Sequence, residues 1–200
     1  MRSLIMAGGA GSRINLGEKP LILICGHPMI AYVIQAFQRA GCEPVVAVSP
    51  QTPMTLNWCR ANGIAFCKAE GEGFVKDMVQ AVRLLEEEDP LFIAVSDIPC
   101  ITGGIVRSIS ESYDSCGKDA LSTWVPAAMV KSCRGDIPYR EKIDGIEACP
   151  AGINILRGDH IDEVQEEHSL LLKEPSLAYN VNTRADLAEA ESFLRRDRRA

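Results

Sequence analysis

The sequence predicts a single α/β domain, in which a mostly parallel central sheet carries helices on both faces and a small antiparallel extension. In the first half, short β-rich runs alternate with segments of helical periodicity, as in a parallel sheet with crossover helices. After residue 120, a strand-like run and an Asp-Gly turn replace this alternation. The 200 residues, 46% of them hydrophobic, supply one core and no surplus for a second, so we expect one domain spanning residues 1–200.

Local patterns place the elements of the first half. After Pro28, apolar residues recur with helical spacing until Gly41 ends the run. Residues 91–95 form a continuous apolar run, which is typical of a strand buried on both faces. The same reasoning predicts strands over 3–6, 45–48, 64–66 and 91–95, and helices over 28–41, 55–62, 74–85 and 104–113.

The second half is predicted to be more mixed. We expect a strand over 120–125, a hairpin turn at Asp144-Gly145 and a strand over 153–156. A polar helix is expected over 159–167 and a last short strand over 179–181. Thr183 and Asp186 then have the spacing of a capping box at the start of a C-terminal helix. The basic residues at the end of that helix complement its dipole, and binding of a ligand phosphate is the alternative.

Charge and composition exclude several classes of function. A net charge of −6 and a pI near 5.2 do not suit a protein that neutralises nucleic acid or an anionic membrane surface. No run approaches the ~20 apolar residues of a membrane helix, and no secretory leader is recognisable, so we expect a cytoplasmic protein without a membrane span. An anionic ligand must then be held by local positive groups.

The cysteines and histidines are interpreted as structural. No two cysteines have the short spacing of a zinc site, and we expect free, mostly buried thiols. The three histidines are expected to be structural or on the surface. These residues are Cys25, Cys42, Cys59, Cys67, Cys100, Cys116, Cys133 and Cys149, with His27, His160 and His168.

A glycine-rich loop follows the first strand and carries Gly8, Gly9 and Gly11. Glycines expose backbone amides, which bind phosphate. The third glycine of a dinucleotide fingerprint is missing, and no P-loop Gly-Lys-Ser/Thr follows, so a dehydrogenase and a P-loop NTPase are disfavoured. Arg13 and Lys19 add two cations that suit a triphosphate. The alternative is a glycine-rich turn with two surface cations.

Two further segments are candidates for the site. Asp97 follows the buried strand at 91–95, where open α/β sheets bind ligands, and its carboxylate suits magnesium; a turn or cap aspartate is the alternative. Near the chain's end, Asn180 and Asn182 flank Val181, and we expect their amides on opposite faces of an extended segment. One of them is then able to reach the metal or the triphosphate, whereas a local turn role is the alternative.

These segments together resemble a known family. LIMAGGAGSR at 4–13, EKPL at 18–21 and GHPMI at 26–30 resemble the opening of the NTP-transferase superfamily, which implies a Rossmann-like nucleotidyltransferase fold. VSPQTP at 48–53, GEGFVKD at 71–77, SDIP at 96–99, AGIN at 151–154 and NVNT at 180–183 look like the single-domain adenosylcobinamide-phosphate guanylyltransferases. The resemblance spans nearly the whole chain.

The resemblance implies transfer of GMP from GTP to adenosylcobinamide phosphate in cobalamin assembly. It also implies roles for particular residues. Asp97 and Asn182 would hold one weakly bound Mg²⁺, because many superfamily members have an acid where this chain has Asn182. The triphosphate would lie on Gly8, Gly9, Gly11, Ser12, Arg13 and Lys19, and Ala7 would also belong to the nucleotide site. Guanine would lie near Ser49, Gly71, Gly73 and Asp77, and Gly152, Asn154 and Asn182 would border the nucleotide and the acceptor.

We expect the acceptor's phosphate to attack the α-phosphorus in line, with Arg13, Lys19 and Asp97 as the catalytic residues. No general base is needed, because a phosphate monoester is already largely deprotonated at neutral pH. The predicted partners are two small molecules, with no nucleic acid, and a homodimer is compatible with the sequence. The alternatives are a molybdopterin guanylyltransferase or other small-molecule nucleotidyltransferase, and a non-catalytic GTP-sensing protein.

Overall fold

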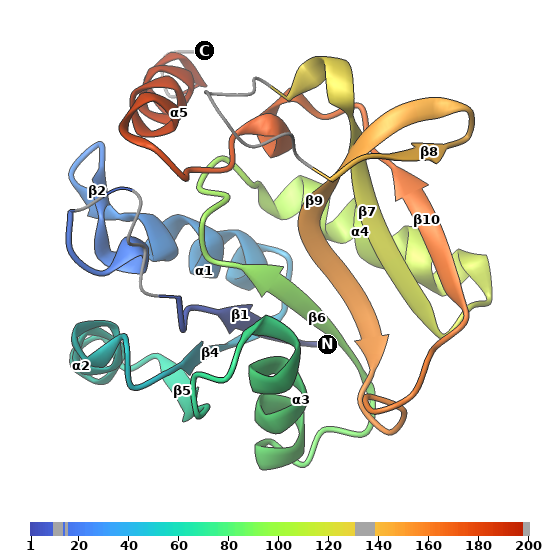
Figure 1. Cartoon of the computed structure of the whole chain (residues 1–200), viewed down its shortest axis with the longest axis horizontal. Coiled ribbons are helices and arrows are strands. Elements are labelled where there is room, and N and C mark those ends of the chain that lie inside the picture. The colour runs from blue at the N-terminus through green and yellow to red at the C-terminus, as the bar shows by residue number, and fades with distance from the viewer. Residues whose placement is uncertain (10–13, 15, 131–138, 198–200) are drawn as a thin grey trace.

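The computed structural model describes residues 1–9, 14, 16–130 and 139–197, and within them an eight-stranded sheet forms the centre (Figure 1). The strand order is β10-β7-β9-β6-β1-β4-β5, with β8 paired to β9, and β2 and β3 form a separate ribbon. The strands are β1 Arg2–Met6, β2 Leu23–Ile24, β3 His27–Pro28, β4 Glu43–Val48, β5 Ala65–Lys68, β6 Pro90–Val95, β7 Ala120–Pro126, β8 Glu141–Ile143, β9 Ile146–Arg157 and β10 Glu167–Leu171.

Helices cover both faces of this sheet, as the sequence predicts. Side chains of β1 alternate between two cores: Ile5 packs with α1 and α4, whereas Leu4 and Met6 pack under α3. Figure 1 accordingly shows α3 in front of the sheet. The helices are α1 Met29–Arg39, α2 Pro53–Ala61, α3 Phe74–Leu84, α4 Gly103–Cys116 and α5 Arg184–Asp197, with short 3-10 turns η1 Lys19–Leu21, η2 Ala127–Met129 and η3 Pro175–Ala178.

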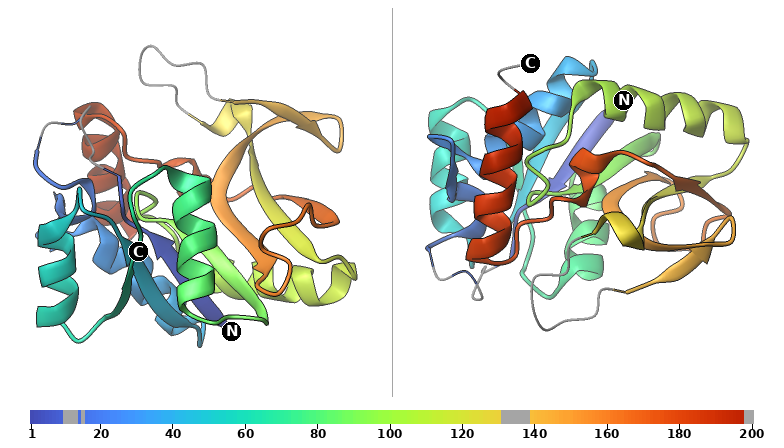
Figure 2. Two further views of the ribbon diagram at one scale, coloured as in Figure 1. Left: turned by 60° about the horizontal axis from the view of Figure 1, so that its bottom comes forward. Right: turned by 90° about the horizontal axis from the view of Figure 1, so that it is seen from above.

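The sheet is mostly parallel, but its antiparallel part is larger than the predicted extension. Strand β1 pairs in parallel with β4 and β6, β4 with β5, and β10 with β7. Strand β9 runs antiparallel between β6 and β7 and continues into the β8–β9 hairpin, whose turn is at the predicted Asp144 and Gly145, both with positive φ. Figure 2 shows this hairpin at the end of the sheet opposite α2.

The helix predicted over 159–167 is wrong. Residues 159–163 form turns, and Glu167 begins β10, a strand that was not predicted because the segment is polar. The backbone of this segment is tied to the chain before β6, because Gly158 N and Asp159 N donate to the carbonyls of residues 89 and 88. The Gln165 side chain also bonds the backbone of Arg157 in both directions, at 2.8 and 2.9 Å. These long-range bonds satisfy groups that a helix would have paired locally.

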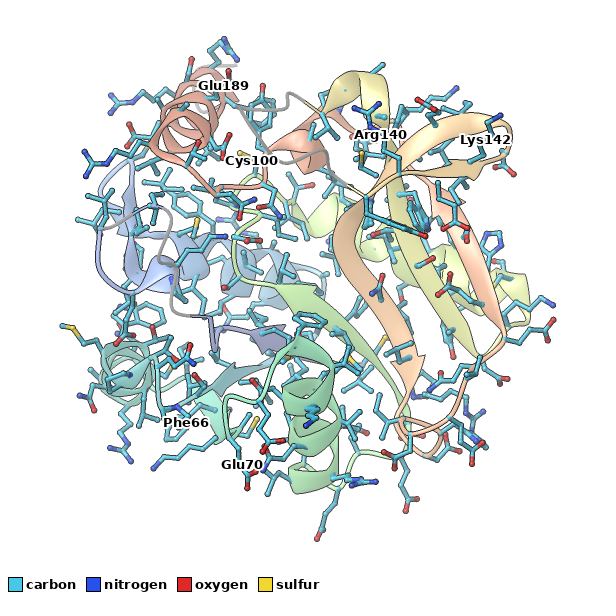
Figure 3. All side chains as sticks on the ribbon, in the orientation of Figure 1. Phe66, Glu70, Cys100, Arg140, Lys142 and Glu189 are labelled. Atoms are coloured by element: carbon cyan, nitrogen blue, oxygen red, sulfur yellow. The ribbon has the colours of Figure 1, made fainter. Side chains whose placement is uncertain are left out.

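The strand predicted over 179–181 is also wrong, whereas the cap that follows it is confirmed. Residues 179–182 form an extended connection after η3, and Val181 N donates to Asp97 O at 2.9 Å. Thr183 N donates to Asp186 Oδ2 at 2.7 Å, and Asp186 N donates to Thr183 Oγ1 at 3.2 Å, which is the predicted capping box of α5. Cys100 lies beside α5 (Figure 3), and its thiol reaches Ala190 O at 3.9 Å.

The seven described cysteines form no disulfide, and four of them are buried, as predicted; Cys133 lies outside the described residues. Burial raises the pKa of both Cys59 and Cys67 to about 11. Because the thiolate is the nucleophilic form, these two groups are unsuited to covalent catalysis near neutral pH. Among the described helices, none is long and apolar enough to cross a bilayer.

Candidate functional site

A pocket of about 430 Å³ lies at the carboxyl ends of the parallel strands β1, β4, β5 and β6. Each strand there gives way to a loop, so residues distant in sequence meet at one edge of the sheet. The lining consists of Met6, Gly8, Gly9, Lys19, Pro20, Gln51, Gly71, Gly73, Phe74, Asp77, Val95, Ser96, Asp97 and Asn182. The structure therefore brings together eight of the residues predicted from the sequence: Gly8, Gly9, Lys19, Gly71, Gly73, Asp77, Asp97 and Asn182.

One wall of the pocket is a closed hydrogen-bonded ring. The Lys19 ammonium is paired with Asp97 Oδ2 and donates to Asn182 Oδ1 at 2.8 Å. Asn182 Nδ2 donates to Asn180 Oδ1 at 2.6 Å, and Asn180 Nδ2 donates to Asp97 Oδ1 at 3.1 Å. The two asparagine amides thus lie on the same side, not on opposite faces as expected, because residues two apart in an extended segment share a face. The Lys19 and Asp97 side chains are each only 16% exposed, so solvent screens their attraction weakly.

Another wall of the pocket presents a second carboxylate, that of Asp77. Asp77, in the first turn of α3, is 7% exposed, and its Oδ1 accepts from Gly71 N and Glu72 N, both at 2.9 Å. Gly71 and Gly73 have φ of 81° and 115°, which favours glycine at both positions of this turn. No hydrogen bond joins Asp77 Oδ2 to any described residue, and a Cβ placed on Gly8 would lie 3.7 Å from it. One oxygen thus holds the turn, while the other is available to a ligand.

Ser49 binds the backbone of the glycine-rich loop at Gly8. Its hydroxyl donates to Gly8 O at 2.7 Å and accepts from Gln51 N at 3.1 Å. A Cβ on Gly8 would come within 3.1 Å of Ser49 Cβ, a tight contact that favours glycine at this position. Ser49 itself is 6% exposed and is not part of the lining, whereas Gln51 is.

Other predicted nucleotide-binding residues lie elsewhere or outside the described part. Ala7 is buried in the core and donates its backbone N–H to Ala47 O at 2.8 Å. Gly152 and Asn154 lie on β9 and do not line the pocket. Gly11, Ser12 and Arg13 fall outside the described residues, and their roles stay predictions.

Gly152 has a structural reason to be glycine. Its φ is +78°, and a Cβ there would lie 2.6 Å from Cγ2 of Val95, which lines the pocket. We expect Gly152→Ala to lower the free energy of unfolding by about 3 kcal/mol, from backbone strain and overpacking together. Chemical denaturation measures this. Gly145→Ala is the control, because Gly145 has a φ of +79° with nothing within 4 Å. Equal losses in the two variants would contradict the contact with Val95.

Both asparagines of the 180–182 segment take part in the site, where one was expected, and further residues line the pocket. Asn180 joins the ring only because Asn182, two positions later, shares its face. Gln51, Phe74 and Ser96 line the pocket from loops whose course depends on the sheet. Within the described chain, no three His, Cys, Asp or Glu side chains gather as a metal centre. Among the described residues that line the pocket, the charged side chains are those of Lys19, Asp97 and Asp77.

Comparisons with known proteins show which proteins this chain is similar to. An adenosylcobinamide-phosphate guanylyltransferase of Methanocaldococcus jannaschii is 32% identical over 98% of this chain and 99% of its own length. A hypothetical transferase from Thermus thermophilus has a TM-score of 0.68 at 18% identity, covering 94% of this chain and 100% of that one.

A CMP:2-keto-3-deoxy-manno-octonic acid synthetase, solved with CTP, has a TM-score of 0.70 at 18% identity, covering 98% of each chain. These two likenesses show the fold. The family described as the MobA-like NTP transferase domain matches residues 3–197. This chain, with its glycine loop and its lysine and aspartate in one pocket, therefore belongs to the MobA-like NTP transferases.

Proposed function

We propose that this chain transfers the GMP group of GTP to adenosylcobinamide phosphate, giving adenosylcobinamide-GDP and pyrophosphate. The likeness to the guanylyltransferase of Methanocaldococcus jannaschii over 98% of the chain supports this acceptor. The observation that carries the proposal is the charge arrangement of the pocket. One wall holds the Lys19 ammonium within its hydrogen-bonded ring, and another holds the Asp77 carboxylate. A triphosphate suits the first wall and a purine with hydrogen-bond donors suits the second.

The base is assigned to the wall that carries Asp77. Guanine presents two neighbouring donors, the N1–H and the N2 amino group, and a carboxylate oxygen is acceptor-only. Asp77 Oδ2 is the carboxylate oxygen of the pocket that has no hydrogen-bond partner among the described residues, because Asp77 Oδ1 is held by Gly71 and Glu72 and both oxygens of Asp97 belong to the ring. Adenine has an acceptor at N1 instead and would face this oxygen unfavourably. GTP is thus the nucleotide that the pocket suits.

The triphosphate is assigned to the wall of Lys19 and the amides of Gly8 and Gly9. A phosphate oxygen of the acceptor attacks the α-phosphorus, a new P–O bond forms, and the bond from the α-phosphorus to the bridging oxygen breaks. Pyrophosphate leaves with that electron pair. Lys19 stabilises the developing negative charge, and Arg13 is predicted to assist. The acceptor needs no general base, since its monoester is already largely deprotonated.

Residues on this wall also fit a magnesium ion. Oxygens of Asp97 and Asn182 already converge on one positive charge, the Lys19 ammonium. Mg²⁺ in nucleotide sites commonly takes one or two carboxylates, water and substrate phosphates, and one carboxylate with one amide meets that need. Asp97 and Asn182 would hold the ion. When bound there, it supplies positive charge against the triphosphate oxygens.

The Asp97→Asn substitution tests this assignment. We expect turnover to fall about tenfold, because an amide oxygen still binds the ion but attracts it less. The concentration of Mg²⁺ needed for half-maximal turnover should rise. Pyrophosphate release across a magnesium titration measures both. Asp159→Asn is the matched control, since it removes the same charge from an exposed carboxylate paired with Arg157. Wild-type behaviour of Asp97→Asn would rule out Asp97 as an essential ligand.

The function itself is tested by offering each of the four common NTPs with adenosylcobinamide phosphate and measuring pyrophosphate release. Release with GTP and acceptor together, and not with GTP alone, supports the proposal. Release only when a molybdopterin acceptor replaces the corrinoid would favour a molybdopterin guanylyltransferase. Tight GTP binding without pyrophosphate release with either acceptor would favour the non-catalytic GTP-sensing protein.

A further inference from the structure

Glu18 makes an unusual contact with a helix distant in sequence. Its Oε1 accepts from Met54 N at 2.7 Å, and its Oε2 accepts from Thr55 N at 2.6 Å and from Thr55 Oγ1 at 2.7 Å. These amides belong to the first turn of α2, whose N–H groups have no partner within the helix. Glu18 thus caps a helix that starts 35 positions later in the chain, at Pro53. Among the described residues, no cation forms a salt bridge with the Glu18 carboxylate.

The local cap of α2 is occupied elsewhere. Thr52 is the N-cap residue, the position from which a hydroxyl normally accepts from the helix amides. Its Oγ1 instead accepts from Ser49 N at 3.1 Å, and its side chain makes no cap bond to α2. Thr52 therefore holds the loop of Ser49, whose hydroxyl binds Gly8 O, and the first-turn amides of α2 are bound by Glu18.

Glu18 is also the residue directly before Lys19, the cation of the pocket. Its carbonyl accepts from Leu21 N at 3.0 Å, which starts the η1 turn, and Pro20 in that turn is buried. The Lys19 backbone is thereby fixed on both sides, by the Glu18 carboxylate on α2 and by the burial of Pro20. From this position the Lys19 ammonium reaches Asp97 and Asn182 in the same wall of the pocket.

We propose that Glu18 is a positioning residue, which anchors Lys19 to the N-terminus of α2 and so sets where the lysine ammonium meets the triphosphate. The N-terminus of α2 thus contacts two parts of the site. Thr52 binds the Ser49 loop, and the first-turn amides bind Glu18, the residue before Lys19. The mechanistic part of the inference rests on the proposed nucleotidyl transfer. The anchoring part rests on geometry alone, and the two are tested separately.

The mechanistic part is tested by a double-mutant cycle on pyrophosphate release. Glu18→Ala is expected to lower kcat about tenfold, because a displaced catalytic group loses rate steeply. In a Lys19→Ala background, the same substitution should cost nothing further, since Glu18 acts through Lys19. Glu18→Gln keeps one accepting oxygen and should retain an intermediate kcat. A tenfold loss that persists in the Lys19→Ala background would overturn the proposal, because Glu18 would then act on the fold or on another group.

Asn62→Ala controls for weakening of α2. Asn62 Nδ2 donates to Trp58 O at 2.8 Å, at the opposite end of that helix. This variant should keep the wild-type kcat even where its melting temperature falls as far as that of Glu18→Ala. An equal loss of kcat in the two variants would assign the effect to α2 stability and overturn the proposal.

The anchoring part is tested without turnover, by trace acetylation of lysines and peptide mapping in the absence of nucleotide. Lys76, whose side chain is 73% exposed, is the internal reference, and the Lys19 side chain is 16% exposed. Lys19 should label slowly in the wild type and in Asn62→Ala, and several-fold faster in Glu18→Ala. An unchanged Lys19 rate in Glu18→Ala would overturn the anchoring. An absence of pyrophosphate release by the wild type would instead count against the proposed function and leave this labelling result standing.

Discussion

The Asp77→Asn variant is expected to lose about 1000-fold in kcat/KM for GTP and to gain activity with XTP. A site built to hydrogen-bond a polar group discriminates strongly against a ligand that mismatches it. Asparagine keeps an Oδ1 for Gly71 N and Glu72 N, so the turn survives, but the atom facing the ligand becomes an N–H donor. Guanine offers donors there, whereas xanthine offers a carbonyl at C2. The ratio of kcat/KM for GTP and XTP measures the change.

Glu70→Gln is the matched control for this experiment. Glu70 is an exposed residue beside the same turn, labelled in Figure 3, and its removal changes the net charge equally. It should keep the wild-type preference for GTP. If Asp77→Asn also keeps that preference while its melting temperature is unchanged, Asp77 only holds the turn and another group selects the base.

The Lys19→Met variant is expected to show two effects of opposite sign. Turnover should fall between about 100- and 1000-fold, because the charge facing the leaving pyrophosphate is lost. The nucleotide-free protein should at the same time bind Mn²⁺ at least about tenfold more tightly, a difference of about 1.4 kcal/mol. The ammonium occupies oxygens of Asp97 and Asn182 that a divalent ion would use, and methionine does not compete for them. Titration of the free Mn²⁺ signal by electron paramagnetic resonance measures the affinity.

Lys76→Met provides the comparison, since it removes the same charge from an exposed side chain paired with Glu72. General electrostatics would tighten Mn²⁺ binding equally in both variants. Only direct competition for the two oxygens gives Lys19→Met the larger effect. Equal affinities would contradict the competition while leaving the loss of turnover to be explained by charge at the leaving group.

The sequence predicts most of the fold because the main elements carry their own signals. The apolar run that became β6 and the periodic helix after Pro28 need no knowledge of the rest of the chain. The meeting of Lys19 with Asp97 was predictable for a related reason, since loops at the carboxyl ends of parallel strands share one edge.

The features that the sequence did not predict depend on contacts between distant segments. Strand β10 exists because β7 offers it an edge to pair with, although Glu167, its first residue, was predicted to end a polar helix. Glu18 was visible in the sequence, but its role needs α2 brought alongside the η1 turn. Such pairings are properties of the folded chain, so local propensity gives no sign of them.

The ring of Lys19, Asp97, Asn180 and Asn182 has a consequence for how the protein is made. Lys19 and Asn182 are 163 positions apart, and Asn182 N is held by Asp186 in the first turn of α5. Synthesis runs from the N-terminus, so a nascent chain of which only β1 to β6 have emerged from the ribosome already contains the glycine loop, Lys19 and Asp77. It still lacks both asparagines. The ring therefore closes only after the segment that starts α5 has left the ribosome.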